Sequence, residues 1–357
     1  MTTPTPRPAW TDAIDLASAR LGGKTLACSD DFFAAMSNLL KPEPPIFIPG
    51  KYTPRGKWMD GWESRRKRTP GHDWCIIQLG QPGSIRGVNV DTAHFNGNQP
   101  EFCTIDAAEL PAPSSKSSKR AAINWSRVEW TELVPRASLG PSSEHFIEPY
   151  AELLDRRFTH LRLNMFPDGG IARLRVHGAV LADWPALIKL KKLLDLAAAE
   201  LGGLVVDASN MHFGSRHNMI MPGRAKNMGD GWETRRKRNL TWLDDRPIES
   251  DWAIIKLAHR GVIDSIEVDT NHFKGNFPES CAIETCDATL APTAEFDPNQ
   301  LAWSWLLPRS ILRASSKHFY RKQLDKATVS RPCTHLRLSI FPDGGISRLR
   351  VSGRPVL

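Results

Sequence analysis

Two short polar segments of the sequence carry side chains that could bind and convert a small anion, and each segment occurs twice. The first reads Asp-Gly-Trp-Glu, then Ser or Thr, then Arg-Arg-Lys-Arg, at residues 60–68 and again at 230–238. Arginine grips a carboxylate through two parallel N–H donors, and neighbouring arginines repel each other unless an anion or a carboxylate lies among them. The segment therefore predicts a substrate-binding loop or strand edge, with these candidates: Trp62, Glu63, Arg65, Arg66, Arg68, Trp232, Glu233, Arg235, Arg236 and Arg238.

Alternation along an extended chain would divide the basic side chains of this segment. Arg65 and Lys67 would point to one side, and Arg66 and Arg68 to the other. A solvated run of charge and a nucleic-acid patch are the alternatives for a single copy. Because the same Asp, Trp and Glu accompany the arginines in both copies, the repetition favours a binding role.

The second segment reads Val-Asp-Thr-x-His-Phe-x-Gly-Asn-x-Pro-Glu, at residues 90–101 and 268–279. An imidazole beside carboxylates can move protons near neutral pH. The same groups could bind a divalent metal, but their spacing matches no standard zinc pattern; they could also cap a turn and fill a core. The candidates for proton transfer are Asp91, His94, Glu101, Asp269, His272 and Glu279, and those for substrate binding are Asn98 and Asn276.

Two further repeated features have a structural and a functional interpretation. Phe-Pro-Asp-Gly-Gly-Ile, at 166–171 and 341–346, is first of all a tight-turn sequence. Its glycine backbone could also direct N–H groups at a ligand. Arg136 and Arg309 each follow a proline, and either belong to a site or support a sheet. The sequence contains no Gly-rich phosphate loop and no nucleophile elbow.

The elements that must position these residues are predicted to be β-strands. Within each repeat, short apolar runs are separated by Gly and Pro, and residues 160–165 alternate strictly between apolar and polar side chains. Residues 74–79 and 85–90 are predicted to form two of about seven or eight strands per repeat. We expect an all-β protein of two tandem jelly-roll β-sandwich repeats, at 15–180 and 196–357, joined by a short helical linker at 181–195. An offset of about 175 residues indicates a duplicated domain, not a solenoid.

Composition restricts the partners of the chain. The net charge of +8 favours anionic partners, but no nucleic-acid-binding module is recognisable, so we expect no nucleic-acid partner. The six cysteines form no CxxC pair, which argues against a disulfide framework and a zinc site. We find neither a signal peptide nor a run of the ~20 apolar residues that cross a membrane. We therefore expect a cytoplasmic protein without a membrane partner.

Taken together, the three repeated segments resemble those of the allantoicase family, and the resemblance covers nearly the whole chain. It implies two jelly-roll repeats similar to galactose-binding-like β-sandwiches. It also implies a hydrolase for carbon–nitrogen bonds in linear amidines, which converts allantoate to ureidoglycolate and urea during allantoin and purine degradation, and a homo-oligomer. The copies differ in places: His72 is matched by Ser250, Ala93 is matched by Asn271, and the first copy has a longer insertion before its Asp-Gly-Trp-Glu.

For that substrate, the candidate residues divide into three roles. The arginines would hold the carboxylate, Asn98 and Glu63 would contact the ureido groups, and His94 with Asp91 or Glu101 would transfer protons; their counterparts would act likewise in the second repeat. We expect no cofactor, with a divalent metal as the alternative. The main rival function is a non-catalytic carbohydrate-binding tandem β-sandwich, since the sequence contains 12 tryptophans that could stack on sugars.

Overall fold

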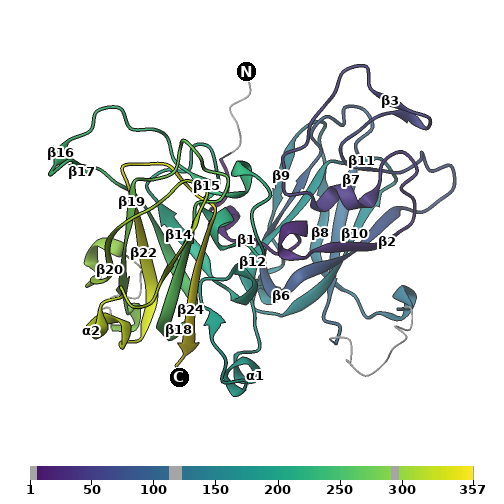
Figure 1. Ribbon diagram of the computed structural model, residues 1–357. Coiled ribbons are helices and arrows are strands. Elements are labelled where there is room, and N and C mark those ends of the chain that lie inside the picture. Colours follow the sequence, from purple (N-terminus) through teal and green to yellow (C-terminus); the bar gives the residue numbers. More distant parts are fainter. Residues whose placement is uncertain (1–5, 112–122, 291–296, 357) are drawn as a thin grey trace. The chain divides into compact units, whose positions relative to one another are not determined.

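The computed structural model describes residues 6–111, 123–290 and 297–356. The chain divides into two compact units, residues 1–181 and 182–357, which are described separately below (Figure 1). Each unit contains one eight-stranded set of paired strands, and all six cysteines are free. The all-β, duplicated fold predicted from the sequence is confirmed.

In the first unit, a single long strand organises the sandwich. The first half of β6 lies between β2 and β10, and its second half lies between β12 and β9. The sheet continues from β10 to β7 and β8, and from β12 to β1. Short 3-10 turns cover Ala9–Asp12, Ala19–Leu21, Met36–Leu40, Trp125–Arg127 and Ala151–Leu153. The strands are β1 (Ile14–Asp15), β2 (Lys24–Cys28), β3 (Tyr52–Thr53), β4 (Gly56–Lys57), β5 (Trp62–Glu63), β6 (Asp73–Asp91), β7 (Phe102–Ala108), β8 (Thr131–Ser138), β9 (Glu144–Ile147), β10 (Phe158–Phe166), β11 (Gly170–Ile171) and β12 (Arg173–Val180).

The two strands predicted at 74–79 and 85–90 are one strand of 19 residues. The Gly-Gln-Pro-Gly sequence at 80–83, which separates the two predicted strands, remains extended where β6 changes partners. A Cβ atom on Gly83 would lie 2.4 Å from the carbonyl oxygen of Ala179, so glycine is required for the close approach of β12. The glycines therefore allow β6 to continue and change its pairing partners, instead of reversing direction.

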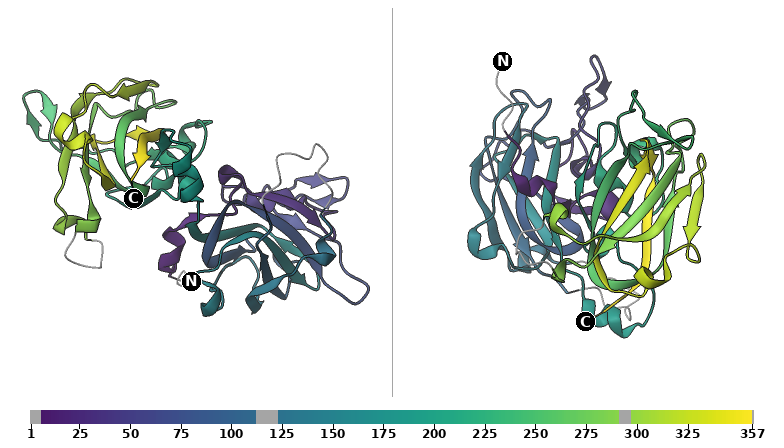
Figure 2. Two further views of the ribbon diagram at one scale, coloured as in Figure 1. Left: turned by 90° about the horizontal axis from the view of Figure 1, so that it is seen from below. Right: turned by 90° about the vertical axis from the view of Figure 1, so that its left-hand side faces the viewer.

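The second unit repeats this topology (Figure 2). Its long strand β18 pairs with β14 and β22 in its first half and with β24 and β21 in its second half. It begins with a short helix, α1 (Trp184–Lys189), in the segment predicted as a helical linker; α2 is Lys326–Val329. The 3-10 turns are Ala199–Leu201, Arg216–Ile220, Met228–Asp230, Ala288–Leu290 and Pro298–Gln300. The strands are β13 (Leu194–Asp195), β14 (Leu204–Ala208), β15 (Trp232–Glu233), β16 (Trp242–Leu243), β17 (Arg246–Pro247), β18 (Asp251–Asp269), β19 (Ser280–Cys286), β20 (Ser304–Ile311), β21 (Lys317–Tyr320), β22 (Cys333–Phe341), β23 (Gly345–Ile346) and β24 (Arg348–Pro355).

The alternating strand β10 shows where the core lies. Leu161, Leu163 and Met165 are fully buried, as the apolar half of the alternation predicts. The opposite face is also largely covered, since His160 and Asn164 are buried. The segment that contains Trp125 reaches this face, where its ring lies 6.0 Å from the His160 ring. Aromatic side chains therefore cover a polar layer on the second face of the sheet.

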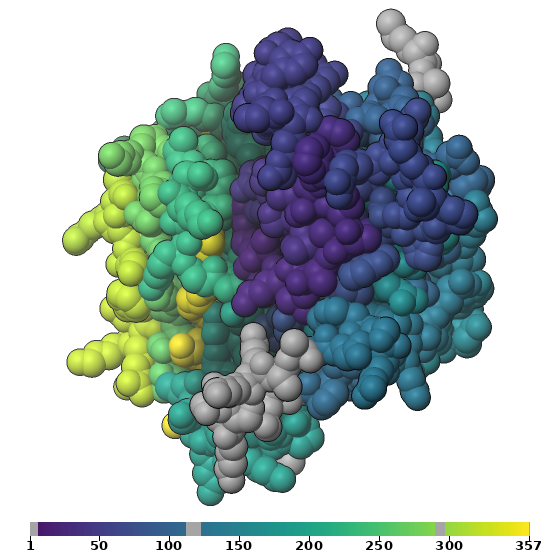
Figure 3. All heavy atoms as spheres, turned by 90° about the vertical axis from the view of Figure 1, so that its right-hand side faces the viewer, coloured from purple at the N-terminus to yellow at the C-terminus, as the bar shows by residue number. Residues whose placement is uncertain are grey.

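Each unit carries a different two-stranded hairpin beside the polar segments. In the first unit, β3 and β4 form a hairpin before the Asp-Gly-Trp-Glu sequence, where the insertion was predicted. In the second unit, β16 and β17 form a hairpin after Arg238. The first hairpin lies in the dark-blue part of the surface in Figure 3, in the same unit as the purple N-terminal segment. The duplicated fold thus carries its additional hairpin at a different point of the sequence in each copy.

Candidate anion-binding site

The basic segment of each unit is anchored by a buried tryptophan. Trp62 and Trp232 are fully buried, and their indole Nε1 atoms donate to the carbonyl oxygens of Asp30 and Asn210 (2.8 Å each). Strand β5 pairs with β11, and β15 pairs with β23, so each Asp-Gly-Trp-Glu sequence lies against the Gly-Ile of the turn segment. The sequence-based assignment of Trp62 and Trp232 to substrate binding stays a prediction; in the structure both rings are core residues.

The second segment packs on the same junction through its phenylalanine. A Cβ atom on Gly170 would lie 1.9 Å from the Phe95 ring, and one on Gly345 would lie 1.9 Å from the Phe273 ring. Only glycine permits this contact. The three repeated segments therefore meet at one place in each unit.

The aspartate of the turn segment holds the backbone of the basic segment. Asp168 Oδ2 accepts from the Lys67 main-chain N–H, and Asp343 Oδ2 accepts from that of Lys237, both at 2.7 Å. The Pro-Asp-Gly-Gly sequence thus forms a turn, and its acid fixes the arginine segment. This contact was not predicted from the sequence.

A buried ion pair fixes the direction of the lysine. Lys67 Nζ lies 2.6 Å from Asp73 Oδ1, and Lys237 Nζ lies 2.6 Å from Asp251 Oδ1. Both aspartates are almost fully buried. Their Oδ1 atoms also accept from the hydroxyl groups of Ser29 and Ser209, at 2.8 Å. Each lysine charge is therefore neutralised by a carboxylate at the start of the long strand.

The arginines of the basic segment differ in their partners. In the first unit, Arg65 pairs with Asp30, with 2.6 Å between Nη2 and Oδ2. In the second unit, Arg235 donates its main-chain N–H to Asn210, and its guanidinium group makes no hydrogen bond or ion pair with a described residue. The pocket of the second unit takes Lys237 together with Arg236 and Arg238, so the predicted alternation is not seen there. Within the described part of the chain, the guanidinium groups of Arg66 and Arg68, and of Arg236 and Arg238, make no hydrogen bond or ion pair. All four side chains are exposed. Arg66 and Arg68, and their counterparts Arg236 and Arg238, thus provide uncompensated guanidinium groups for an anion in each unit.

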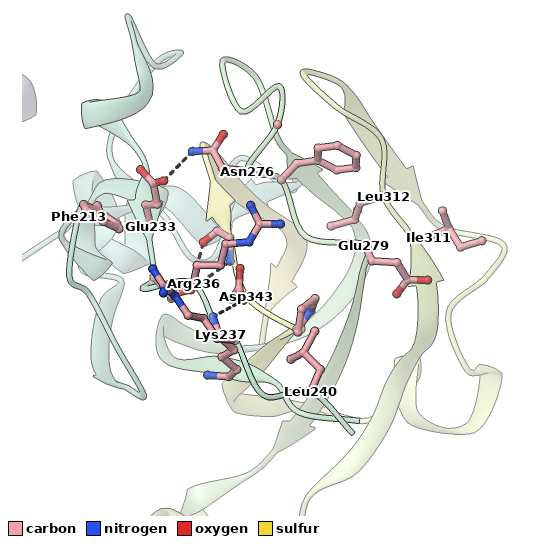
Figure 4. Close-up of a pocket in the computed structure, with 16 residues that line it drawn as sticks. Phe213, Glu233, Arg236, Lys237, Leu240, Asn276, Glu279, Ile311, Leu312 and Asp343 are labelled. Carbon is pink, nitrogen blue, oxygen red and sulfur yellow. Dashed lines mark hydrogen bonds between the residues drawn. The ribbon is translucent and has the colours of Figure 1, made fainter. Parts of the chain in front are cut away.

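In the second unit, these arginines line a pocket of about 880 Å³ (Figure 4). Its wall also contains Glu233 and Asn276, joined by a hydrogen bond of 2.6 Å from Nδ2 to Oε1. Asn98 donates to Glu63 in the same way in the first unit (2.8 Å). The full lining is Phe213, Glu233, Thr234, Arg236, Lys237, Arg238, Leu240, Gly275, Asn276, Phe277, Glu279, Ile311, Leu312, Pro342, Asp343 and Gly344.

The pocket contains five of the residues predicted from the sequence in the second repeat and leaves out four. Glu233, Arg236, Arg238, Asn276 and Glu279 are brought together. The four predicted residues that are not part of the lining are Trp232, Arg235, Asp269 and His272.

Asp91 and Asp269 cap the turn that follows the long strand. Asp91 Oδ1 accepts from the Ala93 N–H, and Asp269 Oδ1 accepts from the Asn271 N–H, at 2.8 Å each. Burial raises the pKa of the Asp91 carboxyl, although the bond from Ala93 opposes the shift. Asp269 is fully buried and lies 3.0 Å from Arg224 Nη1. These contacts shape the loop, and the catalytic role of both aspartates stays a prediction.

His94 and His272 connect this loop to the part of the chain that precedes each Asp-Gly-Trp-Glu sequence. Their Nε2 atoms lie 3.3 Å and 3.0 Å from the carbonyl oxygens of Pro45 and Ala225. Both residues have a left-handed backbone, with φ of 69° and 71°, which is uncommon for a residue with a side chain. The geometry favours a role in loop conformation, while proton transfer by these histidines stays a prediction.

The carboxylates at the pocket differ in environment. Burial opposes ionisation of Glu279, but hydrogen bonds from Ser280 and Arg309 outweigh it and lower the Glu279 pKa. In the first unit, burial raises the pKa of Glu63, against the bond from Asn98. Glu101, the counterpart of Glu279, is exposed. A carboxyl group with a raised pKa is suited to donate a proton, and an ionised one to accept it.

Some pocket residues were missed because their signals were weak. Lys237 and Asp343 lie inside repeated segments, so repetition alone could have identified them. Phe277 occupies a variable position of its segment. Ile311 belongs to β20, close to the repeated Arg309, but its own apolar side chain gave no signal of a site. Only the three-dimensional structure brings this strand to the pocket.

Among the residues that the structure describes, no group of three or more His, Cys, Asp or Glu side chains is placed to hold a metal ion. Among the same residues, no helix is long and apolar enough to cross a membrane.

The fold and the site define a tandem β-sandwich protein with an arginine-lined pocket for a small anion. The family model described as the allantoicase repeat matches residues 14–181 and 194–356. The chain is 45% identical over 340 residues to "Probable allantoicase 1" of Burkholderia mallei, covering 95% of this chain and 94% of the relative. It is 42% identical to "Allantoicase" of Dictyostelium discoideum, covering 96% of this chain and 87% of the relative. The crystal structure of allantoicase from Saccharomyces cerevisiae matches with a TM-score of 0.76 and 36% identity, covering 96% and 93% of the two chains. The chain belongs to the allantoicase family.

Proposed function

We propose that this protein hydrolyses allantoate to ureidoglycolate and urea, a step in the degradation of allantoin and thus of purines. Family membership along nearly the whole chain supports this activity. In the reaction, a water oxygen bonds to the central carbon, the bond from that carbon to one ureido nitrogen breaks, and the departing nitrogen takes up a proton. The enzyme must bind one carboxylate and two ureido groups around that carbon.

The observation that carries the site assignment is the pair of arginines without partners at the second-unit pocket. We assign Arg236 and Arg238 to the substrate carboxylate, because a planar guanidinium can donate two parallel hydrogen bonds to it. Asn276 and Glu233 lie in the same wall and offer an amide and a carboxylate to the ureido groups. Arg66, Arg68, Asn98 and Glu63 take these roles in the first unit.

Proton transfer is assigned to two glutamates of the pocket wall. Glu233 and Glu279 line the pocket, and their counterparts are Glu63 and Glu101. General acid–base assistance contributes roughly 10²–10⁴-fold in rate. Orientation and fixed charge supply the remaining acceleration.

The activity is tested by incubating the purified protein with allantoate and measuring urea release. We expect one urea per allantoate consumed, at the same rate before and after dialysis against a chelator, because the proposal assigns no step to a metal. Absence of urea release would contradict the proposed function. Loss of activity on chelation, with recovery on addition of a divalent metal, would overturn the cofactor-free assignment.

We further propose, from the properties of the family, that the protein acts in the cytoplasm as a homo-oligomer with neither nucleic acid nor membrane as a partner. Light scattering coupled to gel filtration measures the assembly directly. A mass equal to the chain mass of 39.9 kDa at micromolar concentration would contradict the oligomer.

A further inference from the structure

The two copies of the site differ at two positions, which we call the rim: Phe277 and Ile311 in the second unit, and Gln99 and Ser138 in the first. Phe277 in the second unit is matched by Gln99 in the first, one residue after the asparagine of the repeated segment. Ile311 is matched by Ser138: Ile311 pairs with Ser280 across β19 and β20, and Ser138 pairs with Phe102 across β7 and β8. Ile311 is 62% exposed although it lines the pocket. The second site thus has an apolar rim where the first has polar side chains.

The charge on the wall behind this rim also differs. Arg309 Nη2 lies 2.9 Å from Glu279 Oε2, and Arg309 Nε donates to Ser280 Oγ at 2.7 Å. Its Nη1 donates to the carbonyl of Pro247 in the β16–β17 hairpin at 2.8 Å, which ties that hairpin to the wall.

Both arginines lie over an aromatic ring: Arg136 is 4.1 Å from the Phe102 centroid, and Arg309 is 4.1 Å from that of Phe341. Only Arg309 also pairs with a carboxylate among the described residues. Glu101 makes no ion pair with any described residue. The second copy therefore pairs Glu279 with an arginine, whereas the first leaves Glu101 exposed and without an ion-pair partner among the described residues.

Both differences favour anion binding at the second site. A bound molecule would cover Phe277 and Ile311 and so remove apolar surface from water. The same apolar cover reduces the water around Arg236 and Arg238, which strengthens their attraction for a carboxylate. Pairing with Arg309 removes the repulsion that a free Glu279 would exert on the substrate.

We propose that the two sites are unequal: the second-unit pocket binds allantoate more tightly, and Phe277 and Ile311 are the residues that set this difference. The inference rests on the proposed function and specifies which copy acts at low substrate concentration. The expected difference in KM is about tenfold, the effect of covering about 50 Å² of apolar surface.

The test isolates each site in the full-length chain. R66A/R68A leaves only the second site, and R236A/R238A leaves only the first. We expect urea release by R66A/R68A to show a KM about tenfold below that of R236A/R238A. An inactive R236A/R238A would support the inequality more strongly, whereas equal KM values, or an inactive R66A/R68A, would overturn it.

Exchange of the rim residues tests their part in the difference. In the R66A/R68A background, F277Q/I311S should raise KM about tenfold at an unchanged melting temperature. In the R236A/R238A background, Q99F/S138I should lower KM. If neither exchange moves KM, the rim assignment is wrong.

Matched controls separate this inference from the proposed function. R86A and R321A remove exposed arginines that pair with Asp155 and Asp264 away from the site. Both variants should keep the wild-type dependence of urea release on allantoate concentration. If R66A/R68A/R236A/R238A keeps wild-type kcat/KM, the site assignment itself fails. If that variant is inactive and the single-site proteins have equal KM, only the inequality fails.

Discussion

At the scale of residues, the first copy of the site leaves two of its four basic side chains free for a ligand, and the second copy leaves three. Asp73 neutralises Lys67, and Asp30 pairs with Arg65, while Arg66 and Arg68 have no partner among the described residues. The basic residues were identified by their repetition, but their partners were not predictable, because Asp30 and Asp73 belong to other segments. The positions of His94 and His272 were not predictable, because they depend on a left-handed turn and on carbonyl oxygens from a distant segment.

The histidines provide a test of which side chains transfer protons. In H94N/H272N, asparagine tolerates the left-handed backbone, so the loops should keep their conformation. Because His272 does not line the second-unit pocket and His94 occupies the matching loop position, we expect kcat to stay within about tenfold of the wild-type value, measured as urea release at saturating allantoate. A loss of roughly 10²–10⁴-fold in a folded variant would restore the histidines to the mechanism.

At the scale of elements, the buried Lys–Asp pairs join the basic segment to the first residue of the long strand. Lys237 and Asp251 illustrate this, since Asp251 begins β18 and also accepts from Ser209. A change at the strand end should therefore reach the arginines through the lysine backbone, which Asp343 holds from the other side.

Removal of one member of this pair should destabilise the second unit. K237M leaves a buried carboxylate without its cation, which costs about 3–5 kcal/mol. The melting temperature should fall, and KM should rise because Arg236 and Arg238 lose their support. K237M/D251L removes both charges and should recover most of the stability but not the KM. Full recovery of both quantities would show that the pair does not position the arginines.

The polar layer on the second sheet face should make the fold sensitive to mild acid. Burial and the nearby charge of Lys256 together lower the pKa of His335 to about 4, against the opposing effect of Asp287. Burial also lowers the pKa of His160. In the unfolded chain these histidines bind protons below about pH 6.5, whereas in the fold they resist protonation. Stability is therefore complete above about pH 6.5 and is lost as the pH falls toward 4.

We expect the melting temperature to fall by about 5 °C from pH 7 to pH 5, and the H160Q/H335Q variant to show less than half of that fall. Scanning calorimetry at several pH values measures both. An identical pH dependence in the variant would mean that other groups cause the acid sensitivity.

At the scale of the whole molecule, the sequence reveals the duplication but not the differences between copies. The repeated segments predict two all-β units, since their spacing and order are the same. The continuity of β6 through Gly80 to Gly83 was not predicted, because local sequence cannot show that β12 approaches Gly83 closely. The apolar rim at Ile311 was also missed, because that residue reaches the pocket only through the pairing of β19 with β20.

The second unit should fold and work as a fragment. All the strands of its sheet and all the lining residues of its pocket lie between residues 182 and 357. Expressed alone, residues 182–357 should unfold in one cooperative transition and release urea with the KM of R66A/R68A. A fragment without a cooperative transition would show that the unit depends on the rest of the chain.

The central claim is that the arginines without partners bind the substrate carboxylate, and kcat/KM for allantoate tests it most directly. For R66A/R68A/R236A/R238A, folded as judged by its melting temperature, we predict a loss of about 10³-fold, because charged hydrogen bonds contribute about 1.5–3 kcal/mol each. A value within tenfold of the wild-type protein would contradict the account.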